Sequence, residues 1–265
     1  MADKSNSGLL SALKLKRERG IVIRPKIARV IGVFSCKGGV GKTTTAVNIA
    51  AYFSKKMGED NVLAVDANLT APNLGLHLGE LSPKFTIHDV IAEGVPIQKA
   101  VTKCRGMYCI LGSIGYREQV HFIDLKSVLD PLKEKYKLMI IDSAPGIGGD
   151  VVAAMKACDE VIIVSYSDLP TVASTLKTFH LADMYKVHII GVVLNRILGE
   201  PYELSVSDVK EALGWPIIAA VPEDPKVRES TSAGTPIVMY APKSPAAREF
   251  MNLGEYLTKY LSRSQ

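Results

Sequence analysis

The chain is 265 residues long, 47% hydrophobic and 22% charged, with a formal net charge of +5. These proportions are those of an ordinary globular protein, which excludes a disordered or fibrous chain, and the length suits one large domain. The charge is uneven, because residues 1–29 contain eight basic and two acidic residues and the other 236 carry a net charge of −1. A near-neutral body argues against a fold that binds nucleic acid over its whole surface.

The apolar runs and the cysteines exclude further classes of protein. The longest apolar runs have fewer than ten residues, whereas a helix that spans a bilayer needs about 20. The four cysteines form no C-x-x-C pair, which argues against a zinc ribbon or an iron–sulfur scaffold. We therefore expect reduced thiols in a cytoplasmic protein.

From residue 29 onward, short runs rich in β-branched residues alternate with longer segments of helical period. We expect strands at Val30–Ser35, Val62–Asp66, Tyr108–Leu111, Leu138–Asp142, Val161–Ser165, Ile189–Leu194 and Ile217–Val221. We expect helices at Lys42–Met57, Phe122–Tyr136, Pro170–Met184, Ser205–Leu213 and Pro245–Leu261. Several strands are apolar on both faces, as are parallel strands covered by helices on each side. The alternation predicts an α/β fold with a doubly wound, mostly parallel sheet in a single domain.

A glycine-rich segment, Cys36–Thr45, lies between the first predicted strand and the first predicted helix. Glycines there allow backbone N–H groups to approach phosphate oxygens without a Cβ clash. Lys42 is placed to reach β- and γ-phosphates, and the hydroxyl of Thr43 to ligate Mg²⁺. The alternative is a turn that only packs a helix against a sheet. The residues expected to bind phosphate are Gly38, Gly39, Val40, Gly41, Lys42, Thr43 and Thr44.

Two predicted strands end in aspartate, Asp66 and Asp142. In doubly wound sheets the ligand lies beyond the carboxyl ends of the strands, where carboxylates can hold Mg²⁺ beside a nucleotide. The alternative is that each carboxylate only caps its strand end by accepting backbone N–H groups. With Thr43, these two aspartates form the predicted metal site.

The phosphate loop departs from the pattern G-x-x-x-x-G-K-[ST], because Cys36 stands at its first position and Lys37 precedes the glycine pair. This K-G-G-x-G-K-T-T form resembles the MinD/ParA family of ATPases. The resemblance covers about residues 29–261 and implies a P-loop NTPase fold, ATP or ADP with Mg²⁺, and Mg-dependent hydrolysis of ATP. It divides the chain into a basic, partly flexible arm at residues 1–28 and a MinD-like ATPase domain at residues 29–262.

The same resemblance assigns catalytic roles. Asp142, in I-D-S-A-P-G, matches the Walker-B-type aspartate, and Asp66 matches the first aspartate of the MinD switch pattern D-x-D-x-x-x-x-N-L. The family's second aspartate, which orients the attacking water, is Asn68 here. Asparagine can hydrogen-bond a water but cannot take its proton, so we expect slow hydrolysis.

In this family two subunits enclose two ATP molecules, and the lysine that matches Lys37 reaches the phosphates of the partner. The resemblance thus implies an ATP-dependent homodimer in which Lys37 acts beside Lys42 as a trans-acting catalytic cation; the alternative is a solvated loop lysine. Residues of the C-terminal half are similar to those that hold the adenine base in relatives, namely Asn195, Arg196, Pro222, Glu223 and Asp224.

The implied function is that of a MinD-like switch that positions or regulates a partner assembly, as in cell division. One alternative is ParA-like DNA segregation, against which the near-neutral body argues, and another is a metabolic synthetase of the same fold. Bacterial MinD proteins carry their membrane anchor as a short basic amphipathic helix appended beyond the fold. In this chain the last predicted helix has a stripe that we expect to face the core, made of Phe250, Leu253, Leu257, Tyr260 and Leu261. The basic arm is then the candidate for a weak membrane contact or for docking to a protein partner, and we do not expect DNA binding. The expected location is the cytoplasm or the periphery of the membrane.

Overall fold

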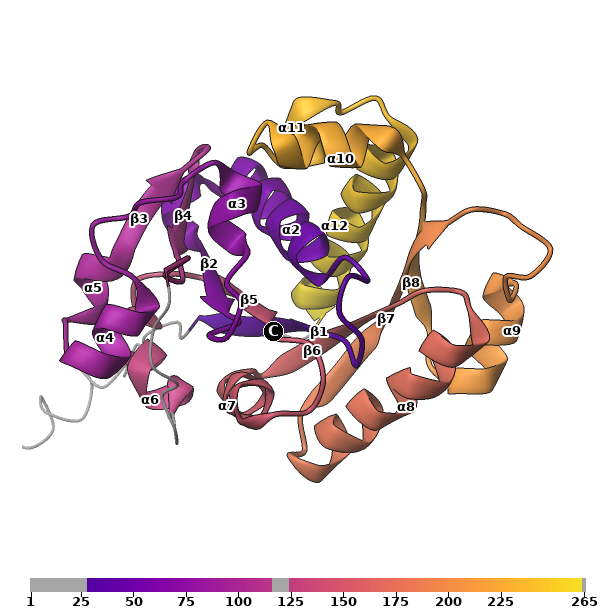
Figure 1. Ribbon diagram of the computed structural model, residues 1–265, viewed down its shortest axis with the longest axis horizontal. Coiled ribbons are helices and arrows are strands. Elements are labelled where there is room, and N and C mark those ends of the chain that lie inside the picture. Colours follow the sequence, from indigo (N-terminus) through magenta and orange to yellow (C-terminus); the bar gives the residue numbers. More distant parts are fainter. Residues whose placement is uncertain (1–27, 116–123, 264–265) are drawn as a thin grey trace, which may run out of the picture.

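The computed structural model describes residues 28–115 and 124–263. In this part of the chain, eight strands form one sheet in the order β3-β4-β2-β5-β1-β6-β7-β8 (Figure 1). All neighbouring strands are parallel except β3 and β4. The strands are β1 (Arg29–Phe34), β2 (Val62–Ala67), β3 (Val101–Cys104), β4 (Met107–Ile110), β5 (Leu138–Ser143), β6 (Glu160–Ser165), β7 (His188–Ile197) and β8 (Ile217–Pro222).

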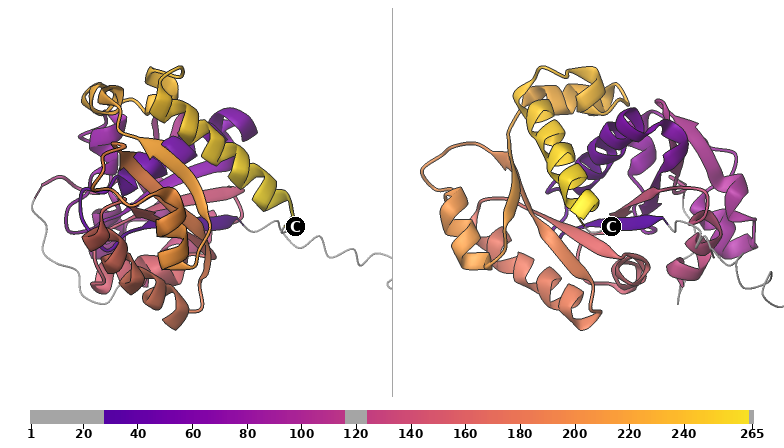
Figure 2. Two further views of the ribbon diagram at one scale, coloured as in Figure 1. Left: turned by 90° about the vertical axis from the view of Figure 1, so that its right-hand side faces the viewer. Right: turned by 180° about the vertical axis from the view of Figure 1, so that it is seen from behind.

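Helices cover both faces of the sheet, as the doubly wound prediction requires. The views from the front and from behind show α2 and α12 on one face and α7 and α8 on the other (Figures 1 and 2). The longer helices are α2 (Lys42–Met57), α7 (Gly149–Ala157), α8 (Leu169–Met184), α9 (Val206–Leu213), α10 (Pro225–Ser232) and α12 (Pro245–Arg263). The shorter ones are η1 (Glu59–Asn61), α3 (Leu74–Leu78), α4 (Ile87–Glu93), α5 (Ile97–Ala100), α6 (Leu125–Leu129), η2 (Asp130–Leu132) and α11 (Ile237–Tyr240).

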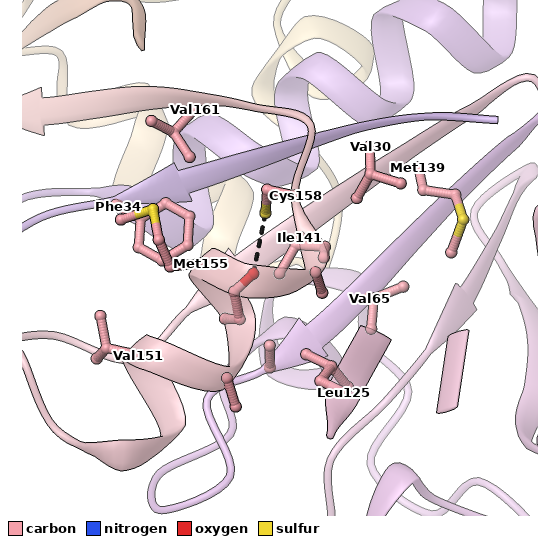
Figure 3. Packing of buried hydrophobic residues seen from close by; sticks show 14 of the residues in the cluster. Val30, Phe34, Val65, Leu125, Met139, Ile141, Val151, Met155, Cys158 and Val161 are labelled. Carbon is pink, nitrogen blue, oxygen red and sulfur yellow. Dashed lines mark hydrogen bonds between the residues drawn. The ribbon is translucent and has the colours of Figure 1, made fainter. Parts of the chain in front are cut away.

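The two faces bury separate apolar clusters. Phe34 and Met155 belong to the cluster beneath α7 and α8, where the Cys158 thiol donates to the Ala154 carbonyl at 3.1 Å (Figure 3). The opposite cluster includes the predicted stripe of α12: Phe250, Leu253 and Leu257 each have 0% exposure, and Tyr260 and Leu261 are partly buried against the cluster. The core-facing prediction for this helix is therefore confirmed.

Three features differ from the sequence prediction. The helix predicted at Phe122–Tyr136 is wrong in extent: α6 ends at Leu129, η2 follows it, and residues before 124 are outside the described part. Pro131 has no N–H to continue an α-helix, so the last turn tightens. The antiparallel edge strand β3 and the helices α3, α4, α5, α7, α10 and α11 were not predicted. Strand β3 buries only one side chain, and most of these helices are too short to show a clear apolar period.

The start of β1 is tied to the sheet by a partly buried ion pair. Arg29 donates twice to the carboxylate of Glu160, at 2.8 and 2.7 Å, and the hydroxyl of Tyr260 donates to the same carboxylate at 2.5 Å. The predicted basic arm of residues 1–28, apart from Ala28, lies outside the described residues. Within those residues, no helix has the length and hydropathy needed to cross a bilayer.

Replacing Glu160 with Gln is expected to lower the free energy of unfolding by about 2 kcal/mol at pH 7, the usual value of hydrogen bonds to a charged group. Burial acts to raise the pKa of Glu160, but the hydrogen bonds from Arg29 and Tyr260 outweigh it and lower that pKa. Because the folded-state pKa is depressed, this stability is present at neutral pH and is lost as the pH falls through the folded-state value.

Urea unfolding between pH 3 and pH 8 is the measurement. The difference between wild type and Glu160→Gln should be constant at neutral pH and shrink in acid. Glu59→Gln is the control, because the Glu59–Lys103 pair is solvent-exposed and such pairs contribute about 1 kcal/mol or less. A difference that is equal at every pH would contradict the ionic account of Glu160.

Candidate functional site

The phosphate loop joins the end of β1 to the first turn of α2 at the carboxyl edge of the sheet (Figure 1). Gly39 and Gly41 have φ of 79° and 96°, which L-residues with side chains rarely adopt. The first turn of α2 contains no acidic residue, so the positive end of its dipole remains available to an anion. The loop therefore has the strand–turn–helix form that the sequence predicted.

Lys42 and Thr43 point from this loop toward the strand ends. The Lys42 ammonium is buried and donates to the Ser35 hydroxyl at 3.0 Å, and burial lowers its pKa. The hydroxyl of Thr43 donates to Oδ2 of Asp142 at 2.6 Å. The other carboxylate oxygen of Asp142, Oδ1, is buried and has no hydrogen-bond partner among the described residues. A buried oxygen of this kind is a position for a cation.

Asp66 lies directly opposite Asp142 in the register of β2 and β5, and both have 0% exposure. Unlike Asp142, it accepts three backbone N–H groups, from Asn68, Asn73 and Leu74, at 3.0 to 3.1 Å. Burial, followed by the charge of Asp142, raises the pKa of Asp66 to about 8. Burial alone raises the pKa of Asp142 to about 6, against the hydrogen bond from Thr43 and the charge of Lys42.

The two aspartates thus differ in how many of their hydrogen bonds would have to break for each carboxylate to bind a metal ion. Asp66 makes the strand-end contacts of a cap, and a direct bond to a cation would replace some of them. Asp142 has an oxygen already free of hydrogen bonds and beside the Thr43 hydroxyl. Of the three predicted metal ligands, Thr43 and Asp142 are placed together without any rearrangement.

Asn68 is turned into its own loop. Its amide Nδ2 donates to the Ala71 carbonyl at 2.5 Å, and its Oδ1 accepts the Ala71 N–H at 3.2 Å. The side chain is 5% exposed. To orient a water, as the sequence prediction supposes, it must leave these two bonds.

Lys37 lies on the other side of the loop and is half exposed. Its Nζ donates to the Thr171 hydroxyl at 3.0 Å and lies 3.9 Å from a carboxylate oxygen of Asp168, at the start of α8. The lysine is thus neither a buried core residue nor a wholly solvated one. Thr171 and Asp168 were not predicted as part of the site, because their separation from Lys37 in sequence exceeds 130 residues.

Beside the loop is a cleft of about 350 Å³ that is lined by all five predicted base-binding residues. Asn195 closes it toward the loop and donates to the Val40 carbonyl at 2.8 Å. Asp224 borders the cleft but also caps α10 and accepts the Ala246 N–H, so it joins the starts of α10 and α12. The predicted residues that line it are Gly39, Gly41, Thr44, Asn195, Arg196, Pro222, Glu223 and Asp224; Gly38, Val40, Lys42 and Thr43 lie outside its lining.

Tyr166 and Arg228 were missed by the sequence analysis. Arg196 lies with its guanidinium 5.4 Å from the Tyr166 ring centre and donates to Glu223 at 2.6 Å, and Arg228 donates to the same carboxylate. The Tyr166 hydroxyl donates to the Gly39 carbonyl, which links this wall to the phosphate loop. Tyr166 directly follows β6, and its position at a strand's carboxyl end was a usable signal.

Comparison with known proteins identifies the family. A family model described as ParA, NUBPL iron-transfer P-loop NTPase matches residues 26–258. The chain belongs to this ParA family of P-loop NTPases. The septum site-determining protein MinD of Synechocystis is 32% identical over 215 residues, which is 78% of this chain and 80% of that protein.

Two solved structures support the same assignment. The cell division ATPase MinD of Pyrococcus furiosus has a TM-score of 0.84 and 31% identity, covering 88% of this chain and 100% of that one. MinD of Pyrococcus horikoshii, complexed with Mg-ADP, also has a TM-score of 0.84, with 30% identity over 90% of this chain and 99% of that one. The predicted doubly wound P-loop fold and the MinD/ParA resemblance are confirmed.

The residues of this ParA-family chain fit a Mg-nucleotide. Asp142 Oδ1 and the Thr43 hydroxyl provide adjacent hard oxygen ligands, the type that Mg²⁺ prefers. Nothing lies within 4 Å of the place a Cβ would take at Gly39, so the loop is open there. Among the described residues, no group of three or more His, Cys, Asp or Glu side chains could hold a metal ion.

Gly41→Ala is expected to lower the free energy of unfolding more than Gly39→Ala. Both substitutions place Ala at positive φ, which costs about 1–2 kcal/mol. At Gly41 the new Cβ would also lie 2.0 Å from Nδ2 of Asn195 and would break its bond to Val40, adding about 1–2 kcal/mol. Chemical denaturation of the two variants measures the difference.

The double variant Gly41→Ala with Asn195→Ala tests the cause. Shortening Asn195 removes the amide that collides with the new Cβ. In the Asn195→Ala background, Gly41→Ala and Gly39→Ala should therefore lower the free energy of unfolding by equal amounts. An additional loss that persists without the Asn195 side chain would show that the collision is not its source.

Proposed function

We propose that this chain is a MinD-like ATPase that binds Mg-ATP, dimerises in that state, and hydrolyses ATP slowly to control a partner assembly. The observation that carries the proposal is the buried oxygen of Asp142, free of hydrogen bonds and beside the Thr43 hydroxyl under a phosphate loop. Family relatives that are MinD proteins, one of them complexed with Mg-ADP, support it.

The proposed roles follow from burial and position. Backbone N–H groups of Gly38 to Thr44 and the start of α2 hold the phosphates. Lys42, fixed by Ser35, supplies a positive charge beneath them, and Thr43 with Asp142 holds the magnesium ion. When bound, that ion neutralises charge on the β- and γ-phosphate oxygens.

The base is proposed to enter the cleft between Asn195 and Pro222. The guanidinium of Arg196, held over the Tyr166 ring and paired with Glu223, provides a flat surface at its edge. Glu223 stays charged, because the hydrogen bond from Arg196 lowers its pKa. Asn195 can exchange its bond to Val40 for one to the base at little expense.

Lys37 is proposed to act on the nucleotide of a second copy of the chain. Its present contacts, to Thr171 and to a carboxylate 3.9 Å away, are half exposed, and exposed pairs contribute about 1 kcal/mol or less. Phosphate oxygens of a partner-bound nucleotide would attract the ammonium more strongly than these contacts hold it.

The central experiment is size-exclusion chromatography with light scattering, in ADP and in a non-hydrolysable ATP analogue with Mg²⁺. We expect a monomer in ADP and a dimer in the analogue. Lys37→Ala should remain a monomer in both while binding either nucleotide with unchanged affinity. Lys243→Ala, which removes an exposed lysine elsewhere, is the matched control and should dimerise normally. A wild-type protein that is monomeric in both nucleotides would refute the switch.

Asn68→Asp is expected to raise the single-turnover rate of ATP hydrolysis. A carboxylate cannot donate to the Ala71 carbonyl, so it loses the bond that holds Asn68 in its loop and is repelled by that oxygen. The released carboxylate can accept a proton from water, and general-base assistance gives about 10²-fold. Rapid-quench measurement with bound ATP gives the rate.

Asn68→Ala distinguishes the loss of the hydrogen bond to Ala71 from the gain of a general base. It removes that bond, as Asn68→Asp does, but supplies no carboxylate to accept a proton. A rate increase with Asp alone supports the role proposed for this position. An unchanged rate in Asn68→Asp would show that position 68 does not limit hydrolysis.

A further inference from the structure

Strands β3 and β4 form a hairpin at the edge of the sheet (Figure 1). Two cysteines, Cys104 and Cys109, face one another across this hairpin. The register pairs Thr102 with Cys109 and Cys104 with Met107, which places both cysteine side chains on the same face of the hairpin. Sγ of Cys109 lies 2.7 Å from Sγ of Cys104 and 3.6 Å from the Thr102 carbonyl oxygen, and its one proton can be donated to either. Since a disulfide is about 2.05 Å long, the sulfurs need to approach by well under 1 Å to bond.

The other two cysteines do not share this arrangement. Cys158 is buried on the opposite face of the sheet and donates to the Ala154 carbonyl. Cys36 belongs to the phosphate loop and is partly exposed. Among the described residues, Cys104 and Cys109 alone have their sulfur atoms in contact.

The hairpin is placed so that a small oxidant can reach it. β3 is the last strand of the sheet on its side, and edge strands open more easily than central ones. The turn residues Arg105 and Gly106 are exposed, while Cys104 is 5% exposed and Cys109 is fully buried. Cys104 is therefore the thiol that an oxidant meets first when the turn frays.

The contact between the two sulfurs shifts the pKa values of the two thiols in opposite directions. The hydrogen bond from Cys109 lowers the pKa of Cys104, and the same bond, with burial, raises the pKa of Cys109. The thiolate is the nucleophile in thiol oxidation. Cys104, which is also the more exposed of the two and adjoins the exposed turn, is thus the thiol that attacks, and the buried Cys109 follows it.

The hairpin also braces the wall of the cleft. Arg105, in its turn, donates to the carbonyls of Gly234 and Ala233 at 2.8 and 3.1 Å, directly after α10. Thr231 and Ser232 of α10 line the cleft. A covalent bond across β3 and β4 would fix the base of the turn from which Arg105 makes these contacts.

We propose that Cys104 and Cys109 form a peroxide-sensitive thiol pair, which a hydroperoxide converts into a disulfide across the β3–β4 hairpin. The Cys104 thiolate attacks the terminal oxygen of the hydroperoxide, so that an S–O bond forms as the O–O bond breaks. The other oxygen leaves as hydroxide (as alkoxide from an organic hydroperoxide), and Cys104 becomes a sulfenic acid. The Cys109 sulfur then attacks the Cys104 sulfur, and the S–O bond breaks as the S–S bond forms. The thiol proton and the displaced oxygen leave as water, so two thiols are oxidised and one peroxide is reduced.

The experiment treats the folded, full-length chain with hydrogen peroxide, alkylates the remaining free thiols at the moment of unfolding, and maps peptides without reduction. Trypsin cleaves after Lys103 and Arg105, so the expected product joins the dipeptide Cys104–Arg105 to residues 106–117 and lacks two hydrogens. Cys36 and Cys158 should be recovered in alkylated form. Recovery of Cys104 and Cys109 as free thiols, or a disulfide through Cys36, would overturn the proposal.

Two further arms use variants and stability. Cys36→Ser and Cys158→Ser should still give the linked peptide, whereas Cys109→Ser should stop at a trappable sulfenic acid on Cys104. Because the bond closes a short loop in the unfolded chain, oxidised wild type should melt at a higher temperature than reduced wild type, and Cys109→Ser should show no such rise. A lower melting temperature after oxidation would show that the hairpin cannot hold the bond. The site does not depend on the proposed ATPase function.

Discussion

Two carboxylates lie side by side at the carboxyl ends of β2 and β5 without solvent exposure, and much of the site compensates for their burial. A buried negative charge must be hydrogen-bonded, paired with a cation or neutralised by a proton. Asp66 is stabilised by three backbone N–H groups of the segment that follows it. Asp142 is stabilised by the Thr43 hydroxyl and the charge of Lys42. The raised pKa values of both carboxylates show that this compensation is incomplete.

This incomplete compensation connects the phosphate loop to the rest of the molecule. In the segment after β2, the backbone N–H groups of Asn68, Asn73 and Leu74 donate to Asp66. In the phosphate loop, Lys42 donates to Ser35 and Thr43 donates to Asp142. Both segments therefore depend on the charge of the same aspartate pair. The first segment leads into α3, which contacts α2 and α10. A cation that neutralises Asp66 and Asp142 therefore weakens the need for hydrogen bonds from the segment after β2. That segment leads through α3 to α10, which lines the cleft. In the proposed function, this is how the nucleotide state reaches the surface.

The fold could be predicted from the sequence where an apolar pattern extends over a whole strand or helix. The site could be predicted where its residues lie next to one another in a single loop. The seven predicted strands all exist, because each is rich in apolar residues, whereas two of the four residues of β3, Thr102 and Lys103, are polar and only one of its side chains is buried. The loop residues could be predicted because they are consecutive. The contacts of Lys37 with Thr171, of Arg196 with Tyr166 and of Cys104 with Cys109 could not, because each depends on side-chain directions that only the folded register determines.

Burial also explains why two lysines of one loop can serve different purposes. Lys42 is 7% exposed, and moving it would leave Asp142 without its nearest positive charge inside the protein, where an unpaired charge is costly. The Lys37 side chain is 42% exposed, and the carboxylate near it is 39% exposed, so water can replace either group when they separate. One lysine is therefore fixed beneath its own loop, and the other can exchange a weak contact for a stronger anion from outside the chain. The proposed division between a cis and a trans cation, which the family resemblance implies, agrees with this difference in solvent exposure.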